Sequence, residues 1–233
     1  MNVVAPGTSS LNITGAVTLE AWIKVAALTG NPQAIIERYG SSYSGNGGYL
    51  LRLNGAGKVV FGTAADAANI DAVVGNTTVT NGVWHHVAGV FDGSQLRVYL
   101  DGQQDGAKAS TFAPTSGTSN LEVGMSGANA FVFPFNGLID EVRVSSGAVY
   151  TVNFTPQGCL TAGAQTKGLW KFDGQTTNDA SGNGNTGSLQ GGAIYSTDVP
   201  VCGGSLPDQT PDWLASFVKS VVSTTLRAAI GLT

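Results

Sequence analysis

The sequence has 233 residues, of which only 11% are charged, and its formal net charge at pH 7 is −4. A chain of this length can bury a sizeable core, and the absence of excess positive charge excludes a nucleic-acid partner held by a basic surface. The 33 glycines and the scarcity of Glu and Lys indicate many strands joined by tight turns rather than helices. No apolar run is long enough to span a bilayer, so we do not expect membrane insertion.

Short strands are expected from the start of the chain. In the run VTLEAWIKV at 17–25, apolar residues alternate with Glu20, Trp22 and Lys24, which is the period of a strand with one buried face. Further strand patterns lie at 34–37, 49–53, 58–62, 83–91, 96–100, 120–123 and 138–144.

Turn signals separate these strands. They are the pairs Asn54-Gly55, Asn81-Gly82, Asp92-Gly93, Asp101-Gly102 and Asn136-Gly137. Such pairs between alternating runs are strong hairpin signals, and regularly spaced short strands predict an all-β sandwich or barrel.

The next part of the chain is less regular. Residues 145–167 form a connection, GLWKF at 168–172 reads as another strand, and 178–187 is a polar loop without hydrophobic period. We expect one domain over 1–195, followed by a linker at 196–210 that is rich in Pro, Gly and Asp.

An amphipathic helix is predicted at 211–230. Thr210 is a good N-cap and Pro211 suits the first helical position. A wide apolar stripe follows, so the helix needs a surface to bury against, either on its own domain or on a partner helix. We expect Trp213, Phe217 and Val221 to make such an oligomer contact.

The two cysteines, Cys159 and Cys202, lie beside Gly158 and Gly203 in loops rather than in apolar strands. This placement favours one disulfide, formed in an oxidising and hence extracellular setting, over two separate buried thiols. The bridge would contribute roughly 4 kcal/mol in the chain-entropy model. Met1 is followed directly by strand-like sequence, so we expect that a leader peptide has been removed or that the sequence is truncated.

Three motifs in order connect the chain with a known family. LEAWI at 19–23, GVWHHVAGVFDGSQLRVYLDG at 82–102 and FNGLIDEVRVS at 135–145 resemble the LamG-like jelly-roll family of the concanavalin A-like lectin/glucanase superfamily. The resemblance covers nearly all of residues 1–195. It implies an antiparallel two-sheet jelly-roll sandwich, a fold that hosts lectins, adhesins, enzymes and structural subunits.

A fourth motif is displaced. Residues 168–193 are similar to the beginning of such a domain but lie at its end. In the family, the first strand pairs beside the strand that carries the IDEV motif. We therefore expect 168–172 to complete the same sandwich in a permuted order; the alternative is that it completes a neighbouring copy and builds an assembly.

Catalysis is not expected. Asp140 and Glu141 are adjacent in a strand and should point to opposite faces, so they cannot act across one glycosidic bond. The alternating carboxylates of the glucanases in this superfamily are missing. We interpret His85 and His86 as strand residues, one buried with a hydrogen bond and the other exposed.

The resemblance implies a structural calcium, because an acidic residue at the position of Asp140 binds calcium in related sandwiches. The polar loop offers matching oxygen ligands in Asp179, Asn183 and Asn185, and Asp173 opens that loop. The alternative is a solvated turn held by hydrogen bonds from the Asp and Asn side chains.

Exposed aromatic side chains could stack on sugars. Tyr39 and Tyr43 flank a Gly/Ser loop and are candidate ligand-binding residues. The sequence thus predicts a non-catalytic extracellular binding or adhesion module for a glycan or cell-surface component. The alternative is a structural subunit of a surface assembly or filament, a homo-oligomer that uses the helix or an exchanged strand for its contacts.

Overall fold

The computed structural model describes residues 2–38, 48–66, 70–126 and 133–200. Within these ranges the chain is almost entirely β-structure. The first strands are β1 (Asn2–Ala5), β2 (Val17–Val25), β3 (Gln33–Arg38), β4 (Gly48–Leu53), β5 (Lys58–Ala64) and β6 (Ile70–Thr78). They are followed by β7 (Trp84–Phe91), β8 (Gln95–Leu100), β9 (Gln103–Ala109), β10 (Leu121–Val123), β11 (Gly137–Ser146), β12 (Thr166–Trp170) and β13 (Ser188–Gln190). Two short 3₁₀ turns, Ser9–Leu11 and Asp173–Gln175, complete the elements.

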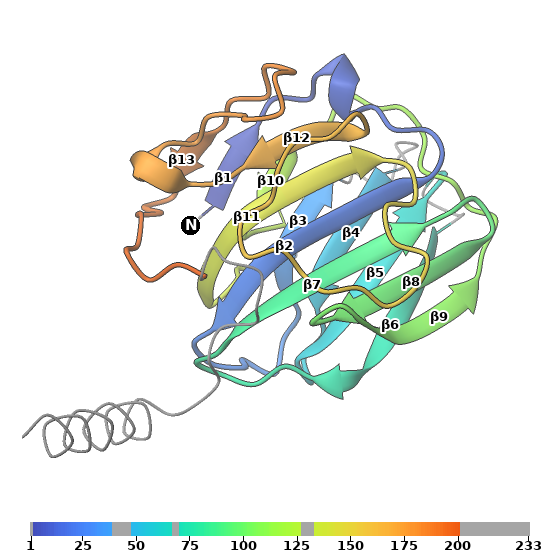
Figure 1. Ribbon diagram of the computed structural model, residues 1–233, viewed down its shortest axis with the longest axis horizontal. Coiled ribbons are helices and arrows are strands. Elements are labelled where there is room, and N and C mark those ends of the chain that lie inside the picture. The colour runs from blue at the N-terminus through green and yellow to red at the C-terminus, as the bar shows by residue number, and fades with distance from the viewer. Residues whose placement is uncertain (1, 39–47, 67–69, 127–132, 201–233) are drawn as a thin grey trace, which may run out of the picture.

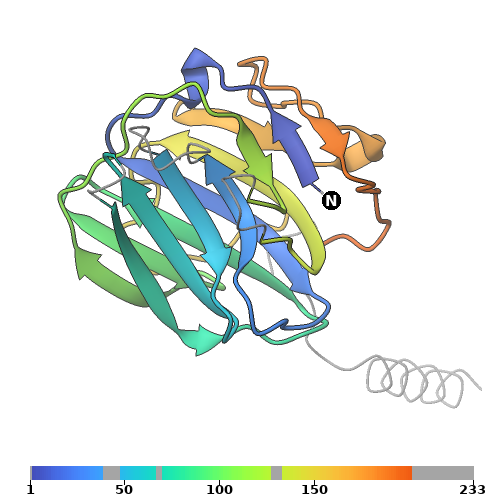
Figure 2. The ribbon, with the colours of Figure 1, turned by 180° about the vertical axis from the view of Figure 1, so that it is seen from behind.

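The strands form two antiparallel sheets that face each other (Figures 1 and 2). The seven-stranded sheet has the order β13-β1-β10-β3-β4-β5-β6, and the six-stranded sheet has the order β12-β11-β2-β7-β8-β9. The predicted two-sheet sandwich is therefore confirmed. The described residues contain no helix long and apolar enough to cross a membrane.

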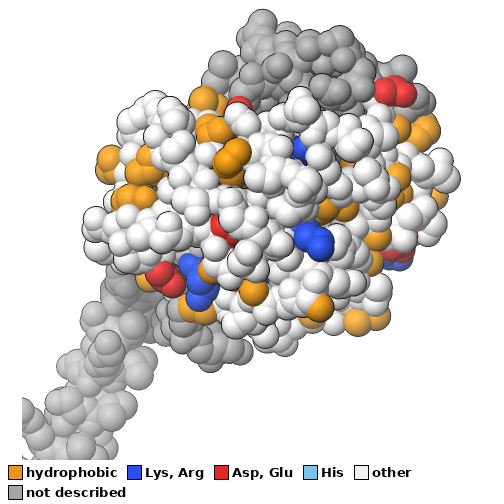
Figure 3. Space-filling model, turned by 90° about the horizontal axis from the view of Figure 1, so that it is seen from above, with side chains coloured by type: hydrophobic (Ala, Val, Ile, Leu, Met, Phe, Trp, Pro, Cys, Tyr) orange, Lys and Arg blue, Asp and Glu red, His pale blue; other side chains and the backbone are white. Residues whose placement is uncertain are grey.

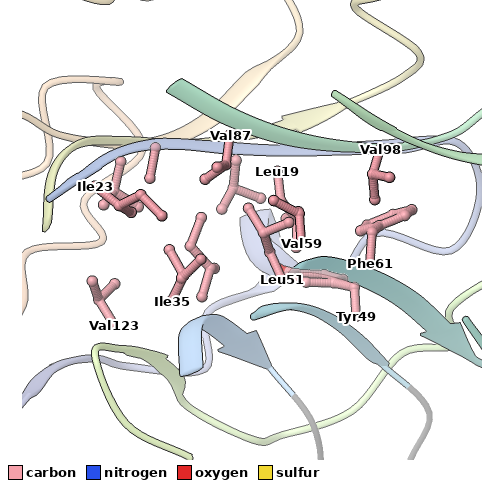
Figure 4. Close-up of a cluster of buried hydrophobic side chains, with 14 of the residues drawn as sticks. Leu19, Ile23, Ile35, Tyr49, Leu51, Val59, Phe61, Val87, Val98 and Val123 are labelled. Atoms are coloured by element: carbon pink, nitrogen blue, oxygen red, sulfur yellow. The ribbon is translucent and has the colours of Figure 1, made fainter. Parts of the chain in front are cut away.

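The core lies between the two sheets and follows the alternation along each strand. Leu19, Ile23 and Val87 of the six-stranded sheet point toward Leu51 and Phe61 of the seven-stranded sheet (Figure 4). All five are fully buried, and each apolar side chain removed from water contributes about 1.5–3 kcal/mol. The period-two pattern thus locates this core correctly.

The outer face of the six-stranded sheet is also buried. Residues 147–161, here called the covering segment, cross this face, and Tyr150 stacks on Phe154 with ring centroids 3.6 Å apart. Both rings pack over Tyr99, and the indole Nε1–H of Trp22 donates to the Gln157 carbonyl at 2.9 Å. This face is therefore closed to a ligand.

A buried ionic network fastens the covering segment to the sheet. Glu20 accepts hydrogen bonds from Arg143 Nε at 2.8 Å, from the Tyr150 hydroxyl at 2.7 Å and from His86 Nε2 at 3.2 Å. Burial raises the pKa of Glu20, but the His86 hydrogen bond and the Arg143 charge outweigh it and hold that pKa below its usual range. The expectation that one histidine is exposed is wrong. His86 is fully enclosed, and His85 is buried beside Asp101, whose carboxylate lies 2.8 Å from His85 Nδ1.

Within the chain, β12 pairs antiparallel with β11, and Leu169 lies opposite Arg143. The observed strand begins at Thr166 and ends at Trp170, because Phe172 adopts a left-handed conformation with φ of 55°. Exchange of this strand between copies and the predicted division into domains stay predictions. The predicted helix at 211–230 lies outside the described residues.

Candidate functional site

A pocket of about 210 Å³ lies where the β1–β13 side of the seven-stranded sheet meets the start of β11. We call it the edge pocket. Its walls include Trp84, Phe135, Phe172, Leu189 and Tyr195. Apolar and aromatic walls of this kind are the usual surroundings of a small-molecule site.

The pocket exists because three distant parts of the sequence meet. β1 brings Asn2, β11 brings Asp140, and the segment after β13 closes the remaining side with residues 193–199. This segment runs from β13 past the start of β11 (Figures 1 and 2). We call residues 193–199 the closing segment.

Two polar contacts fix the closing segment to the six-stranded sheet. Asp198 Oδ2 lies 2.7 Å from Lys24 Nζ, and Asp198 Oδ1 accepts a hydrogen bond from Trp84 Nε1 at 2.9 Å. The Lys24 hydrogen bond lowers the pKa of Asp198. The carboxylate therefore stays charged and holds the wall of the pocket in place.

Asn2 and Asp140 are buried polar residues that line the pocket. Asn2 is 5% exposed, and its Oδ1 is closed off from solvent and has no hydrogen-bond partner. Asp140 is 6% exposed; its Oδ1 accepts the Glu141 N–H, and burial raises its pKa to about 6.

Asp140 and Glu141 do not simply point to opposite faces of a regular strand. The register shifts between Asp140 and Arg143, and Glu141 has a φ of 49°, so a β-bulge interrupts the alternation. The two carboxyls nevertheless have different surroundings. Asp140 lines the pocket, whereas Glu141 Oε2 accepts the Leu160 N–H at 2.6 Å beneath the covering segment.

A small acidic cluster surrounds the bulge. Burial raises the pKa of Glu141 to about 7, and the neighbouring charges of Asp140 and Asp173 act in the same direction. Lys171 Nζ is 3.9 Å from Glu141 and 3.8 Å from Asp173. One lysine thus faces three carboxyl groups, an arrangement that a further cation would stabilise.

The predicted calcium ligands fall into two groups. Asp140 and Asp173 belong to the acidic cluster. The remaining predicted ligands, Asp179, Asn183 and Asn185, instead organise the polar loop and its contact with β12. The described residues contain no group of three His, Cys, Asp or Glu side chains suited to hold a metal, and the calcium ion stays a prediction.

In this loop Asp179 already accepts four hydrogen bonds. They come from the backbone N–H groups of Leu169, Ser181 and Asn185 and from the Ser181 hydroxyl, at 2.8–3.0 Å. Asn185 donates from Nδ2 to the Lys167 carbonyl at 2.6 Å. These contacts correspond to the alternative interpretation, a turn held by side-chain hydrogen bonds.

Several predicted residues lie outside the part of the chain that the structure describes. They are the candidate ligand-binding residues Tyr39 and Tyr43 and the candidate oligomer contacts Trp213, Phe217 and Val221. Cys159 carries no free thiol and is disulfide-bonded. Because Cys202 also lies outside the described residues, the bridge between them stays a prediction.

The sequence does not predict the edge pocket. Asn2 precedes the first clear strand pattern, and the closing segment overlaps the linker expected at 196–210. A weak signal existed in Ile194, Tyr195 and Val199, which are apolar residues within an otherwise polar stretch. Only the fold brings them beside Asp140.

Comparisons with known proteins agree with this architecture. The family model described as the concanavalin A-like lectin/glucanases superfamily matches residues 2–151. A comparison with curated proteins gives no match.

Solved structures with the same fold include a candidate carbohydrate-binding protein from Bacteroides ovatus. It shares 20% identity with a TM-score of 0.67 over 86% of this chain, which spans only 59% of that protein. The CBM40 domain of a Ruminococcus gnavus sialidase, bound to α2,3-sialyllactose, shares 15% identity with a TM-score of 0.53. That match covers 63% of this chain and 86% of the domain.

Proposed function

Because the chain belongs to the concanavalin A-like lectin/glucanases superfamily, we propose that it is a non-catalytic glycan-binding module whose binding site is the edge pocket. One observation carries the proposal. The pocket combines aromatic walls with the carboxyl group of Asp140, an acceptor for a sugar hydroxyl. Aromatic faces suit the apolar C–H side of a sugar ring.

The outer face of the six-stranded sheet is not a second candidate site. It is buried beneath the covering segment, with Trp22 and Tyr99 fully enclosed. In the view from above, charged side chains are scattered singly among uncharged ones rather than gathered in one patch (Figure 3). A surface of this kind is compatible with an uncharged ligand.

The position of the two carboxyls supports binding without hydrolysis. A glycosidase needs two carboxyl groups on either side of one bond. Asp140 and Asp198 line the pocket, but Asp198 is paired with Lys24 and Trp84 in the pocket wall. Glu141 is held under the covering segment by Leu160 and is not among the pocket residues. The names of the Bacteroides and Ruminococcus proteins, a candidate carbohydrate-binding protein and a carbohydrate-binding module, support the same class of ligand.

A glycan array tests this proposal with three proteins: the wild type, a pocket-blocking variant and a surface control. Leu189→Trp places an indole in the pocket wall, whereas Val152→Trp changes a side chain on the covering segment that is 71% exposed. We expect glycan binding by the wild type and by Val152→Trp, and its loss in Leu189→Trp. An array without a hit for the wild type would contradict the proposal.

We further propose a structural calcium at the acidic cluster. Asp140 and Asp173 would hold it, and the buried carboxyl groups beside a single lysine support such an ion. When bound, calcium would neutralise the carboxylates around the β11 bulge.

Thermal unfolding in calcium and in chelator tests the calcium proposal. Calcium should raise the Tm of the wild type by about 3 °C or more and leave that of Asp173→Asn unchanged. Equal Tm values for the wild type in calcium and in chelator would contradict this part of the proposal.

An extracellular location is part of the proposal, because glycans and disulfides both belong to that setting. The alternative function, a subunit of a surface assembly, depends on contacts of residues beyond the described part of the chain. A mass measurement in solution distinguishes the two, since a glycan-binding module of this kind is expected to be a monomer and an assembly subunit an oligomer.

A further inference from the structure

We propose that the edge pocket binds one neutral residue at the end of a glycan and rejects terminal residues that carry a carboxylate or a sulfate. This inference rests on the proposed function and adds the class of sugar to it. Three properties of the pocket carry it: its size, its polar groups and its charge.

The size of the pocket limits the ligand to about one ring. Its volume of about 210 Å³ lies below the range of about 300–1,000 Å³ that is typical for drug-sized ligands. Residues 193–199 close one side, and the contacts of Asp198 with Lys24 and Trp84 hold that wall. A closed wall favours entry of a chain end over passage of an extended chain.

The polar groups select a ligand that donates hydrogen bonds. Asp140 lines the pocket and accepts the Glu141 N–H on Oδ1. Trp84 Nε1 is already committed to Asp198, so the indole offers its apolar ring rather than a donor. A hydroxyl or an amide N–H of a sugar would pair with the Asp140 carboxyl group, while the C–H face of the ring packs on the aromatic walls.

The charge of the pocket excludes anions. Asp140 and Asp198 are among the lining residues, and the described lining residues include no Lys, Arg or His. Two lysines lie beside the pocket and are both paired: Lys24 with Asp198, and Lys171 with Glu141 and Asp173. An acidic sugar would place an unpaired negative charge beside Asp140 in a largely apolar site, which is costly.

Matched glycans test the inference directly. Each neutral glycan that binds on the array is compared, by calorimetric titration of the full chain, with the same glycan capped by sialic acid or sulfate. We expect the cap to weaken binding at least tenfold in chelator, where no metal ion neutralises the Asp140 carboxylate. Equal or tighter binding of the capped glycans would overturn the inference and leave the proposed function intact, whereas an array without any hit would contradict the proposed function itself.

Discussion

At the scale of single residues, Glu20 shows that a sequence pattern can predict the correct face of a strand and still miss the burial of the side chain. The alternation in 17–25 predicts that Glu20 lies on the polar face of its strand, opposite the core. The side chain does lie opposite the core, but it is fully buried because the covering segment packs over that face. A sequence period reports which face a residue occupies, and it cannot report what covers the face.

Glu20→Gln should destabilise the protein by about 3–5 kcal/mol. The substitution leaves the buried Arg143 guanidinium without its carboxylate, and an uncompensated buried charge is costly. Urea unfolding of both proteins measures the difference in free energy. As a control, Asp71→Asn removes the partner of the half-exposed Lys108 and should cost less than about 1 kcal/mol; similar costs for the two variants would contradict the role of the network.

The raised pKa of Asp140 predicts how the stability of the folded protein depends on pH. Burial raises its pKa from 3.8 to about 6, so its contribution to stability is fully present below pH 4 and is lost as the pH rises through 6. In chelator, the stability of Asp140→Asn relative to the wild type should therefore increase by about 1.4 kcal/mol between pH 5 and pH 8. Denaturant titrations at both pH values measure this change, and a constant difference would show that the Asp140 carboxyl is not perturbed.

At the scale of elements, the polar loop that follows β12 acts as a cap on the edge of a sheet. Side chains of Asp179, Ser181, Asn183 and Asn185 bond to backbone groups of β12 or of residues beside it. Edge strands expose unpaired N–H and C=O groups, and covering them prevents unwanted pairing with other chains. The polar composition of the loop is visible in the sequence. That the loop covers a sheet edge becomes clear only from the position of β12 in the structure.

Asp179→Ala should destabilise the protein by about 2–3 kcal/mol, in calcium and in chelator alike. It removes an acceptor of four hydrogen bonds, and backbone groups of β12 then lose their partner. Hydrogen exchange at the Leu169 amide should become faster. Asn178→Ala, at an exposed neighbouring position, should change stability by less than about 0.5 kcal/mol; a cost for Asp179→Ala that appears only in calcium would instead identify Asp179 as a ligand.

The strands that the sequence pattern missed are β6, β9 and β13, which all lie at sheet edges. β9 (Gln103–Ala109) carries almost no apolar residue, β13 has three residues, and β6 has nine residues without a regular alternation. β9 is nevertheless held against β6 by polar contacts, such as the Asp105 carboxylate with the Thr77 hydroxyl at 2.7 Å. A hydrophobic period cannot detect elements that are stabilised in this way.

At the scale of the whole molecule, the sandwich could be predicted because core alternation, turn pairs and family motifs all pointed to it. The candidate site could not. The edge pocket joins Asn2, Asp140 and Asp198, which are far apart in the sequence and carry no shared pattern. Asp140 is a pocket residue that the sequence does predict as a site residue, but for a different ligand, calcium.

Reduction of the predicted Cys159–Cys202 bridge should lower the stability of the whole domain by roughly 4 kcal/mol. Cys159 precedes Leu160, which is bonded to Glu141, and Cys202 follows the closing segment. Reduction should therefore also weaken glycan binding. Mass spectrometry with thiol labelling checks the pairing, and two free thiols in the untreated protein would contradict it.

The proposal that the edge pocket is the binding site is tested most directly by NMR shift mapping of the ¹⁵N-labelled chain with a glycan that binds on the array. We expect the largest chemical-shift changes at Asn2, around Asp140 and along residues 193–199. Changes concentrated elsewhere on the sandwich, with these residues unaffected, would contradict it.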